Sequence, residues 1–234
     1  MNISIWSDIR CPFCYIGKRK FEAALSKFPH KDAITFEWKS FELDPTLETN
    51  TNINAINHFI ESKGVDADDA SEMFNNVTEM ASEVGLNFNL NNAVVANSLN
   101  AHRLLHFAKT LNRSNELKEA LLKAHLEEGK NIDDLEVLIE IASTVGIDKN
   151  DAKTVLTSEQ YTYDVRQDQM EARNLGINAV PFFVINNKYG ISGAQPESVF
   201  AKNLEKIWEE TNKSPLKMAE VSNDNTCDIN GNCN

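Results

Sequence analysis

The stretch SDIRCPFCYIGKRKFEAAL, residues 7–25, places two cysteines where a short strand gives way to a helix. Upstream of it, residues 2–6 alternate apolar and polar side chains, as strands do. Downstream, residues 12–28 have the character of an amphipathic helix, and Pro12 suits its first position because the N–H that proline lacks would have no partner there. The sequence therefore predicts a strand, a Cys-Pro-Phe-Cys box and a helix in succession.

The start of a helix favours the ionised form of the first cysteine in the box. A thiol attacks a disulfide only as the thiolate, and the unpaired N–H groups and partial positive charge at a helix N-terminus stabilise that form. We therefore expect Cys11 to attack a substrate disulfide and Cys14, one turn further in, to resolve the mixed disulfide. Arg10 should favour the thiolate and Asp8 should oppose it. The box contains Phe13 and no histidine, so we expect moderate oxidising power.

Two other interpretations of the box stay open. Free cysteines are often buried as small apolar side chains. Paired cysteines are also half of a tetrahedral zinc site, and Cys227 and Cys233 supply a second pair. Zinc knuckles usually lie on Gly-rich turns, which a Pro-Phe insert at the start of a long helix does not resemble. We therefore expect no bound metal.

Further β regions flank a long helical stretch. Residues 33–41 alternate as a second strand, and residues 180–194 contain two β-rich runs around Asn186-Asn187, a pair that tolerates a hairpin turn. Between them, from about residue 52 to 160, apolar side chains recur at steps of three and four, which predicts helices almost throughout. A last helix is expected from Pro196, and residues from about 213 onward show no periodicity and are predicted to be a tail.

Composition and charge exclude several classes of function. The chain of 234 residues carries a formal net charge of −12, which argues against nucleic acids and anionic membranes as partners. No segment approaches the roughly 18 apolar residues of a membrane span. The N-terminus lacks the basic head and apolar core of a secretory signal, so we expect a cytoplasmic protein if Met1 is the natural start. In a reducing compartment, close cysteine pairs indicate catalysis or metal binding.

The segments DIRCPFCYIG and GINAVPFFVINNKYGISGAQP, with the helical block between them, resemble the DsbA-like branch of the thioredoxin superfamily, in particular the FrnE-type proteins. The resemblance covers about residues 1–210. It implies an α/β protein, a thioredoxin fold with a large all-helical insertion: a thioredoxin-like domain of residues 1–50 and 161–212 and an inserted helical domain of residues 51–160. The lack of periodicity after them predicts a flexible cysteine-containing tail of residues 213–234.

The resemblance also implies a cis peptide bond between Val180 and Pro181, placed against the two cysteines. Such a bond would expose the backbone of Val180 beside Cys11, where an extended peptide could pair with it as an added strand. Without the resemblance, Pro181 would be interpreted as a residue that starts a strand.

Glutathione-using relatives, the kappa-class transferases and the 2-hydroxychromene-2-carboxylate isomerases, look similar across the helical block, including NSLNAHRLLHFA. They carry serine in the place of Cys11, so this chain's cysteine favours thiol chemistry. His102 and His106 are spaced four apart, but they lack the glutamate of the HExxH zinc motif. We interpret them as polar positions on a helix or at the domain junction.

The second cysteine pair, Cys227 and Cys233, suggests an internal relay. About 14 residues separate residue 213 from Cys227, and fully extended they reach on the order of 45 Å, far enough to visit the first pair. We therefore hypothesise that the tail pair exchanges electrons with Cys11 and Cys14 or regulates access to them. The alternative is a disordered tail whose cysteines are incidental.

These observations together predict a thiol-disulfide oxidoreductase, with disulfide isomerisation as a candidate second activity. Cys11 attacks, Cys14 resolves, and four residues shape the substrate site: Pro12, Phe13, Val180 and Pro181. No bound cofactor is expected; glutathione is a candidate co-substrate, and the partners are disulfide-containing proteins or small thiols. The alternatives are a glutathione-dependent transferase or isomerase and a zinc-binding or chaperone-like module. The sequence makes no prediction about oligomeric state.

Overall fold

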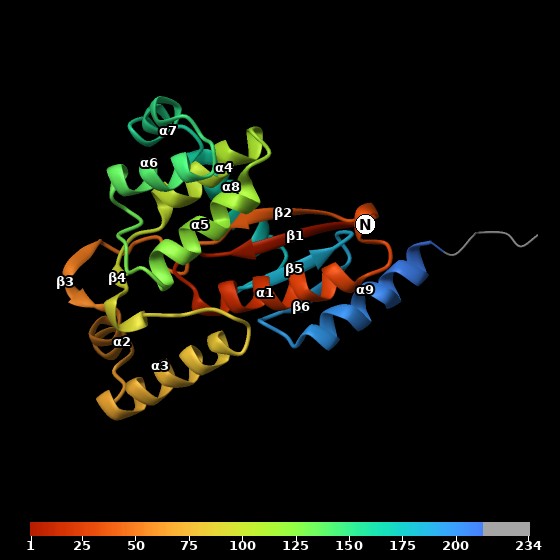
Figure 1. Ribbon diagram of the computed structural model, residues 1–234, viewed down its shortest axis with the longest axis horizontal. Helices are drawn as coiled ribbons and strands as arrows, with labels where there is room; N and C mark the ends of the chain where they lie inside the picture. Colours follow the sequence, from red (N-terminus) through yellow and green to blue (C-terminus); the bar gives the residue numbers. More distant parts are fainter. Residues whose placement is uncertain (213–234) are drawn as a thin grey trace, which may run out of the picture.

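A four-stranded mixed sheet forms the centre of the computed structural model, which describes residues 1–212 (Figure 1). The strand order is β2-β1-β5-β6. Strand β1 (Asn2–Ser7) pairs in parallel with β2 (Thr35–Ser40) and antiparallel with β5 (Phe182–Ile185), which continues antiparallel into β6 (Tyr189–Ser192). The two ends of the described chain therefore meet in one sheet, with Ile5 opposite Phe183.

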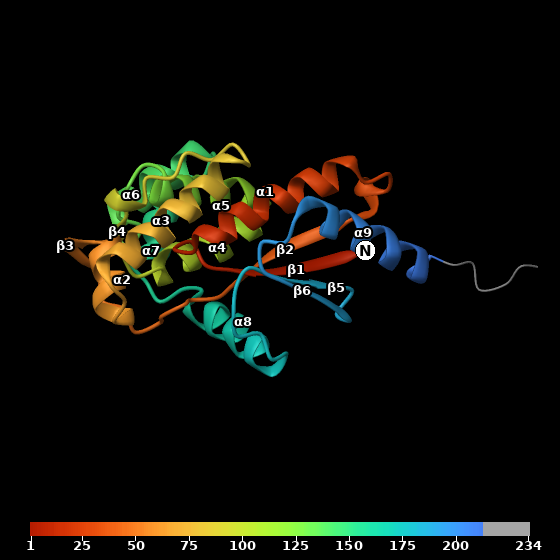
Figure 2. The ribbon, with the colours of Figure 1, turned by 90° about the horizontal axis from the view of Figure 1, so that it is seen from below.

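Helices cover both faces of this sheet (Figure 2). Helices α1 (Pro12–Lys27) and α9 (Glu197–Thr211) pack on one face, where Ile3 and Ile5 of β1 are buried against Phe21 of α1 and Phe200 of α9. Helix α8 (Thr162–Asn174) covers the other face, where Trp6 packs with Ala172. Successive side chains of a strand point to opposite faces, and each large apolar side chain buried there contributes about 1.5–3 kcal/mol. These two layers fix α1 against the sheet.

The insertion between β2 and α8 is mainly helical, as the sequence predicts. Its helices are α2 (Ala55–Lys63), α3 (Ala67–Ser82), α4 (Leu99–Thr110), α5 (Ser114–Leu126), α6 (Leu135–Thr144) and α7 (Lys149–Leu156). Asp66, Asp134 and Asp148 cap the starts of α3, α6 and α7 by accepting hydrogen bonds from backbone N–H groups. A buried cluster of α4–α7 side chains, including Leu104, holds the helices together.

The insertion also contains a small sheet that the helical pattern did not predict. Strand β3 (Asn50–Asn54) pairs antiparallel with β4 (Val94–Val95) through an irregular register. The sequence of β3, NTNIN, has one apolar residue and no apolar alternation, so its strand conformation has no local signal. Two short 3₁₀ helices, η1 (Lys31–Ala33) and η2 (Leu90–Asn92), complete the elements.

The late hairpin agrees with the sequence prediction. Asn186 and Asn187 connect β5 to β6 with φ values of 51° and 53°, the left-handed region that a tight hairpin turn requires. In residues 1–212, no helix is long and apolar enough to cross a membrane. The predicted relay residues, Cys227 and Cys233, lie outside the described residues.

Candidate functional site

The two cysteines of the box lie at the start of α1, where β1 leads into it. Cys11 is the N-cap residue, with an extended backbone (φ −88°, ψ 112°), and Pro12 begins the helix. The backbone N–H of Cys14 donates to the carbonyl of Cys11 at 3.0 Å, which places the two residues on one turn. Both thiols are free; Cys11 is 5% exposed and Cys14 is 1% exposed. Cys11 is therefore the sulfur nearer to solvent.

The two thiols share their ionisation. The hydrogen bond with Cys14, burial and the charge of Asp8 raise the pKa of Cys11. Burial also raises the pKa of Cys14, but the hydrogen bond from Cys11 and the positive charge of Lys118 outweigh it, so that the pKa of Cys14 is lowered. When two groups interact this strongly, the first proton is lost from the pair, and its apparent pKa belongs to neither thiol alone. From the sequence, the helix N-terminus favoured a negative charge on Cys11. The structure adds a cation beside Cys14 that the sequence around the box does not reveal.

That cation comes from the helical insertion. Lys118 lies on α5, is 1% exposed, and donates to the carbonyl of Ser7 at 3.4 Å. Its ammonium nitrogen also lies 5.6 Å from the ring centroid of Trp38. The sequence analysis missed Lys118, although it falls three and four residues before the buried Leu121 and Leu122. A lysine among the apolar positions that form the buried face of a helix was the signal in the sequence that could have identified it.

A buried carboxylate, Asp8, lies just before the box in the sequence. Asp8 is fully buried and accepts from the backbone N–H groups of Leu43 at 2.9 Å and Arg10 at 3.3 Å; its Oδ1 lies 3.3 Å from His102 Nε2. Burial raises the pKa of Asp8, but His102 and the backbone donor hold it well below its usual range. Asp8 is therefore ionised and, as the sequence suggested, opposes a thiolate at Cys11.

The hairpin completes the site from the other end of the chain. The bond between Val180 and Pro181 is cis, and Cys11 Sγ lies 3.7 Å from the Val180 carbonyl oxygen. Pro181 packs against Gly17 of α1. Phe13 of the box is 40% exposed, and Leu43, whose backbone binds Asp8, is 50% exposed. The structure thus brings the predicted site residues of the box and hairpin together and adds apolar surface beside them.

The two histidines of α4 face different partners. His102 is buried against Asp8, whereas His106 Nε2 lies 3.1 Å from both Ser40 Oγ and Asp168 Oδ2. Among residues 1–212, no group of three or more His, Cys, Asp or Glu side chains could hold a metal ion. This leaves the zinc hypothesis, which needs the terminal cysteine pair, without support in the described part of the chain.

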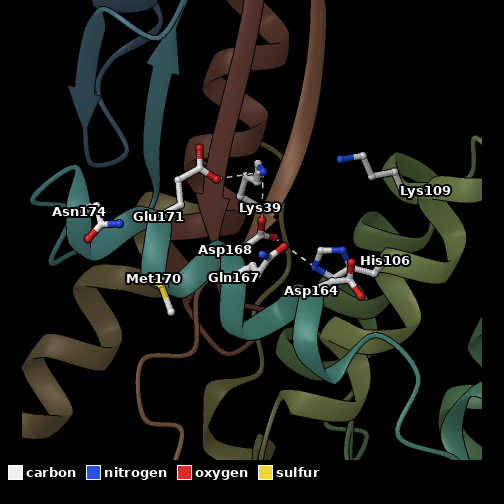
Figure 3. Close-up of a pocket in the computed structure, with 9 residues that line it drawn as sticks. All are labelled: Lys39, His106, Lys109, Asp164, Gln167, Asp168, Met170, Glu171 and Asn174. Atoms are coloured by element: carbon white, nitrogen blue, oxygen red, sulfur yellow. Dashed lines mark hydrogen bonds and ion pairs between the residues drawn. The ribbon is translucent and has the colours of Figure 1, made fainter.

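A separate cavity of about 390 Å³ lies beside His106, between α4 and α8 (Figure 3). Several of its charged groups already pair with one another: Lys39 lies 3.1 Å from carboxylate oxygens of both Asp168 and Glu171, and Asp168 also faces His106. Neither cysteine of the box lines it. We assign no chemistry to this cavity.

Comparison with known proteins gives the family. The DSBA-like thioredoxin domain matches residues 2–205. The chain belongs to the DsbA-like thioredoxin family. The YwbO protein of Bacillus subtilis (strain 168) is 30% identical over 209 residues, covering 87% of this chain and 96% of its own. This confirms the fold class inferred from the sequence.

Solved structures of this DsbA-like family agree. The crystal structure of a probable DsbA oxidoreductase, SCO1869 from Streptomyces coelicolor, is 34% identical, covers 100% of this chain and 98% of its own, and superposes with a TM-score of 0.86. The cytosolic disulfide reductase DsbM from Pseudomonas aeruginosa is 14% identical, covers 90% of this chain and 100% of its own, and has a TM-score of 0.64. The likeness to DsbM shows a shared fold.

Proposed function

We propose that this DsbA-like protein is a thiol-disulfide oxidoreductase that works through Cys11 and Cys14. The observation that carries the proposal is the free pair at the start of α1, with Cys11 Sγ 3.7 Å from the Val180 carbonyl and a buried lysine beside Cys14. The Cys11 thiolate attacks one sulfur of a substrate disulfide, forming a mixed disulfide and releasing one substrate thiolate. Cys14, as the thiolate, then attacks Cys11 Sγ, and the second substrate thiolate leaves with the electron pair.

The surroundings of Cys11 support substrates with an extended backbone. Cys11 is the more exposed of the two cysteines, and Phe13, two residues further along the chain, offers an exposed apolar side chain. Val180 lies two residues before Phe182, the first residue of β5, so a bound peptide can continue the strand pattern there. The proposal covers protein disulfides, including their isomerisation, and small disulfides such as glutathione disulfide.

A resolving-cysteine variant tests this function. In a Cys227→Ser, Cys233→Ser background, Cys14→Ala leaves Cys11 able to attack with no second thiol to resolve the product, so a mixed disulfide should accumulate. Mass spectrometry after incubation with a disulfide peptide, or with glutathione disulfide, should find one adduct per chain on Cys11. The variant Cys11→Ala, Cys14→Ala in the same Cys227→Ser, Cys233→Ser background is the control and should carry no adduct. If the single variant stays unmodified while wild type is also unreactive, the proposed function is wrong.

The two alternative functions find less support in the described residues. The glutathione-using relatives named above carry a serine where this chain has Cys11. Among the described residues, no contact favours glutathione transfer over thiol-disulfide exchange. The zinc-binding alternative requires Cys227 and Cys233, which lie outside the described residues. The relay by these cysteines and the cytoplasmic location both stay predictions.

A further inference from the structure

Lys118 is a buried cation that the attack of Cys11 does not use. It is 1% exposed, and its ammonium group, which has three donors, makes one long hydrogen bond to the Ser7 carbonyl. Within residues 1–212, no carboxylate lies within 4.0 Å of its nitrogen, whereas Lys18, also buried, binds Glu22 and Glu119 at 2.6 Å each. A buried charge is costly unless a partner compensates it. Lys118 therefore calls for an anion that the carboxylates around it do not supply.

The groups that face Lys118 identify this anion. On α1 they are Cys14, Cys11 and Lys18; Asp8 faces it from the connection between β1 and α1, and His102 from α4. Asp8 already binds His102 and two backbone N–H groups. His102 is held neutral by burial, which lowers its pKa. Cys14 is the group whose negative charge interacts most strongly with Lys118, and it exists as an anion only when the thiol ionises.

We infer that Lys118 is the positioning residue of the resolving step: it stabilises the Cys14 thiolate and takes the proton that Cys14 gives up. This inference rests on the proposed function. In the mixed disulfide, the neutral amine of Lys118 accepts the proton from the Cys14 thiol. The Cys14 thiolate then attacks Cys11 Sγ, the bond between Cys11 and the substrate sulfur breaks, and the substrate leaves as a thiolate. The Lys118 proton passes to that thiolate, so that no further oxidant is required.

The ionisation of Lys118 suits this exchange. Burial lowers the pKa of Lys118 from its usual 10.5 to about 8, against the opposing charges of Cys14, Asp8 and Cys11. Near neutral pH the amine is therefore present in both forms, which a group that exchanges a proton must be. The helical insertion therefore contributes a residue to the resolving step, because α5 places Lys118 beside the start of α1.

Three variants test the inference. Lys118→Met keeps the length and apolar stem without the charge; Lys118→Arg keeps a charge that does not exchange protons; and Lys123→Met, exposed on the same helix, is the matched control. In a Cys227→Ser, Cys233→Ser background, the ultraviolet absorbance of the thiolate reports the ionisation of Cys11 and Cys14. Rapid acid quenching with mass spectrometry reports the lifetime of the mixed disulfide at Cys11. Circular dichroism checks that each variant folds.

In Lys118→Met, we expect the first ionisation of the pair to shift upward by about one pKa unit or more, and the mixed disulfide to live about tenfold longer. Lys118→Arg should restore the ionisation. If a folded Lys118→Met behaves as Lys123→Met does in both measurements, or if Lys118→Arg ionises as Lys118→Met does, the inference is overturned. A wild-type protein that forms no mixed disulfide at Cys11 would instead contradict the proposed function. If Lys118→Met does not fold, Lys118→Arg still decides through the lifetime of the mixed disulfide: arginine cannot take the Cys14 proton, so the mixed disulfide should live longer than in wild type, and an equal lifetime would overturn the inference.

Discussion

Gly17 is the residue through which α1 packs against Pro181. A Cβ atom built on Gly17 would lie 2.8 Å from Pro181 Cγ and 3.5 Å from Ala194 Cβ. Alanine stabilises an ordinary helix interior by roughly 0.5–1 kcal/mol relative to glycine. Here the proline ring must shift, and it carries Val180 with it. We predict that Gly17→Ala destabilises the protein by about 1–3 kcal/mol, as overpacking does, and lowers the rate of mixed-disulfide formation at Cys11.

Chemical denaturation and a single-turnover assay with a small disulfide measure these two effects. Ser26→Ala, at an exposed position of the same helix, serves as the control and should leave both unchanged. A Gly17→Ala protein as stable and as reactive as this control would show that the contact with Pro181 does not position the site.

At the scale of elements, a partly buried ionic cluster joins α5 to α1. Glu119 accepts hydrogen bonds from three side chains of α1: Tyr15 Oη at 2.5 Å, Lys18 Nζ at 2.6 Å and Arg19 Nη1 at 3.0 Å. Glu119 directly follows Lys118 in the sequence, so the same turn of α5 holds α1 and faces its dithiol. We infer that this cluster keeps the insertion in register with the site.

Removing the carboxylate should loosen this contact. We predict that Glu119→Gln lowers the free energy of unfolding by about 2 kcal/mol at neutral pH, since it leaves the buried Lys18 with one carboxylate and Arg19 with a weaker acceptor. Glu116→Gln on the same helix removes an exposed pair with Arg113 and should cost less than about 0.5 kcal/mol. Equal losses in the two variants, measured by urea denaturation, would contradict the role of Glu119 in joining α5 to α1.

The contribution of Glu119 should also depend on pH. Burial raises the pKa of Glu119, but hydrogen bonds from Arg19, Lys18 and Tyr15 lower it from its usual 4.5 to about 2. A carboxyl whose pKa is depressed by folding stabilises the protein fully above its unfolded value and loses that effect as the pH falls through the folded value. The difference in stability between wild type and Glu119→Gln should therefore be constant above about pH 5 and shrink between pH 4.5 and 2. A difference that does not change across this range would exclude the ionised carboxylate as its source.

At the scale of the whole molecule, local patterns predicted more of the fold than of the site. The strand, box and helix around Cys11 and the turn at Asn186-Asn187 each depend on neighbours in sequence, so periodicity and turn chemistry reveal them. Ser7 and Lys118 are 111 positions apart, and nothing local indicates that the first half of α5 passes beside the box. Strand β3 has no apolar alternation in its sequence, because its strand conformation comes from the pairing with β4. The ionisation of the dithiol was misjudged for the same reason, since it is set by a contact distant in sequence.

The net charge of the molecule gives a prediction about substrates. The chain has 35 acidic and 23 basic residues, a formal charge of −12, so its long-range field attracts cations. Raising the ionic strength from about 0.01 M to about 0.15 M shortens the screening length from about 30 Å to about 8 Å. We predict that this change slows attack on cystamine, which is cationic, and speeds attack on glutathione disulfide, each by about threefold.

Neutral hydroxyethyl disulfide is the control and should react at a rate independent of salt, as measured by stopped-flow loss of thiolate absorbance. The opposite salt dependence would mean that the positive charges beside the dithiol, Arg10 and Lys118, outweigh the field of the whole chain at the point of attack. In that case charge reversal at exposed acidic positions would leave the rates unchanged, whereas Lys118→Met would remove the salt effect, so that the two measurements separate a local field from a global one.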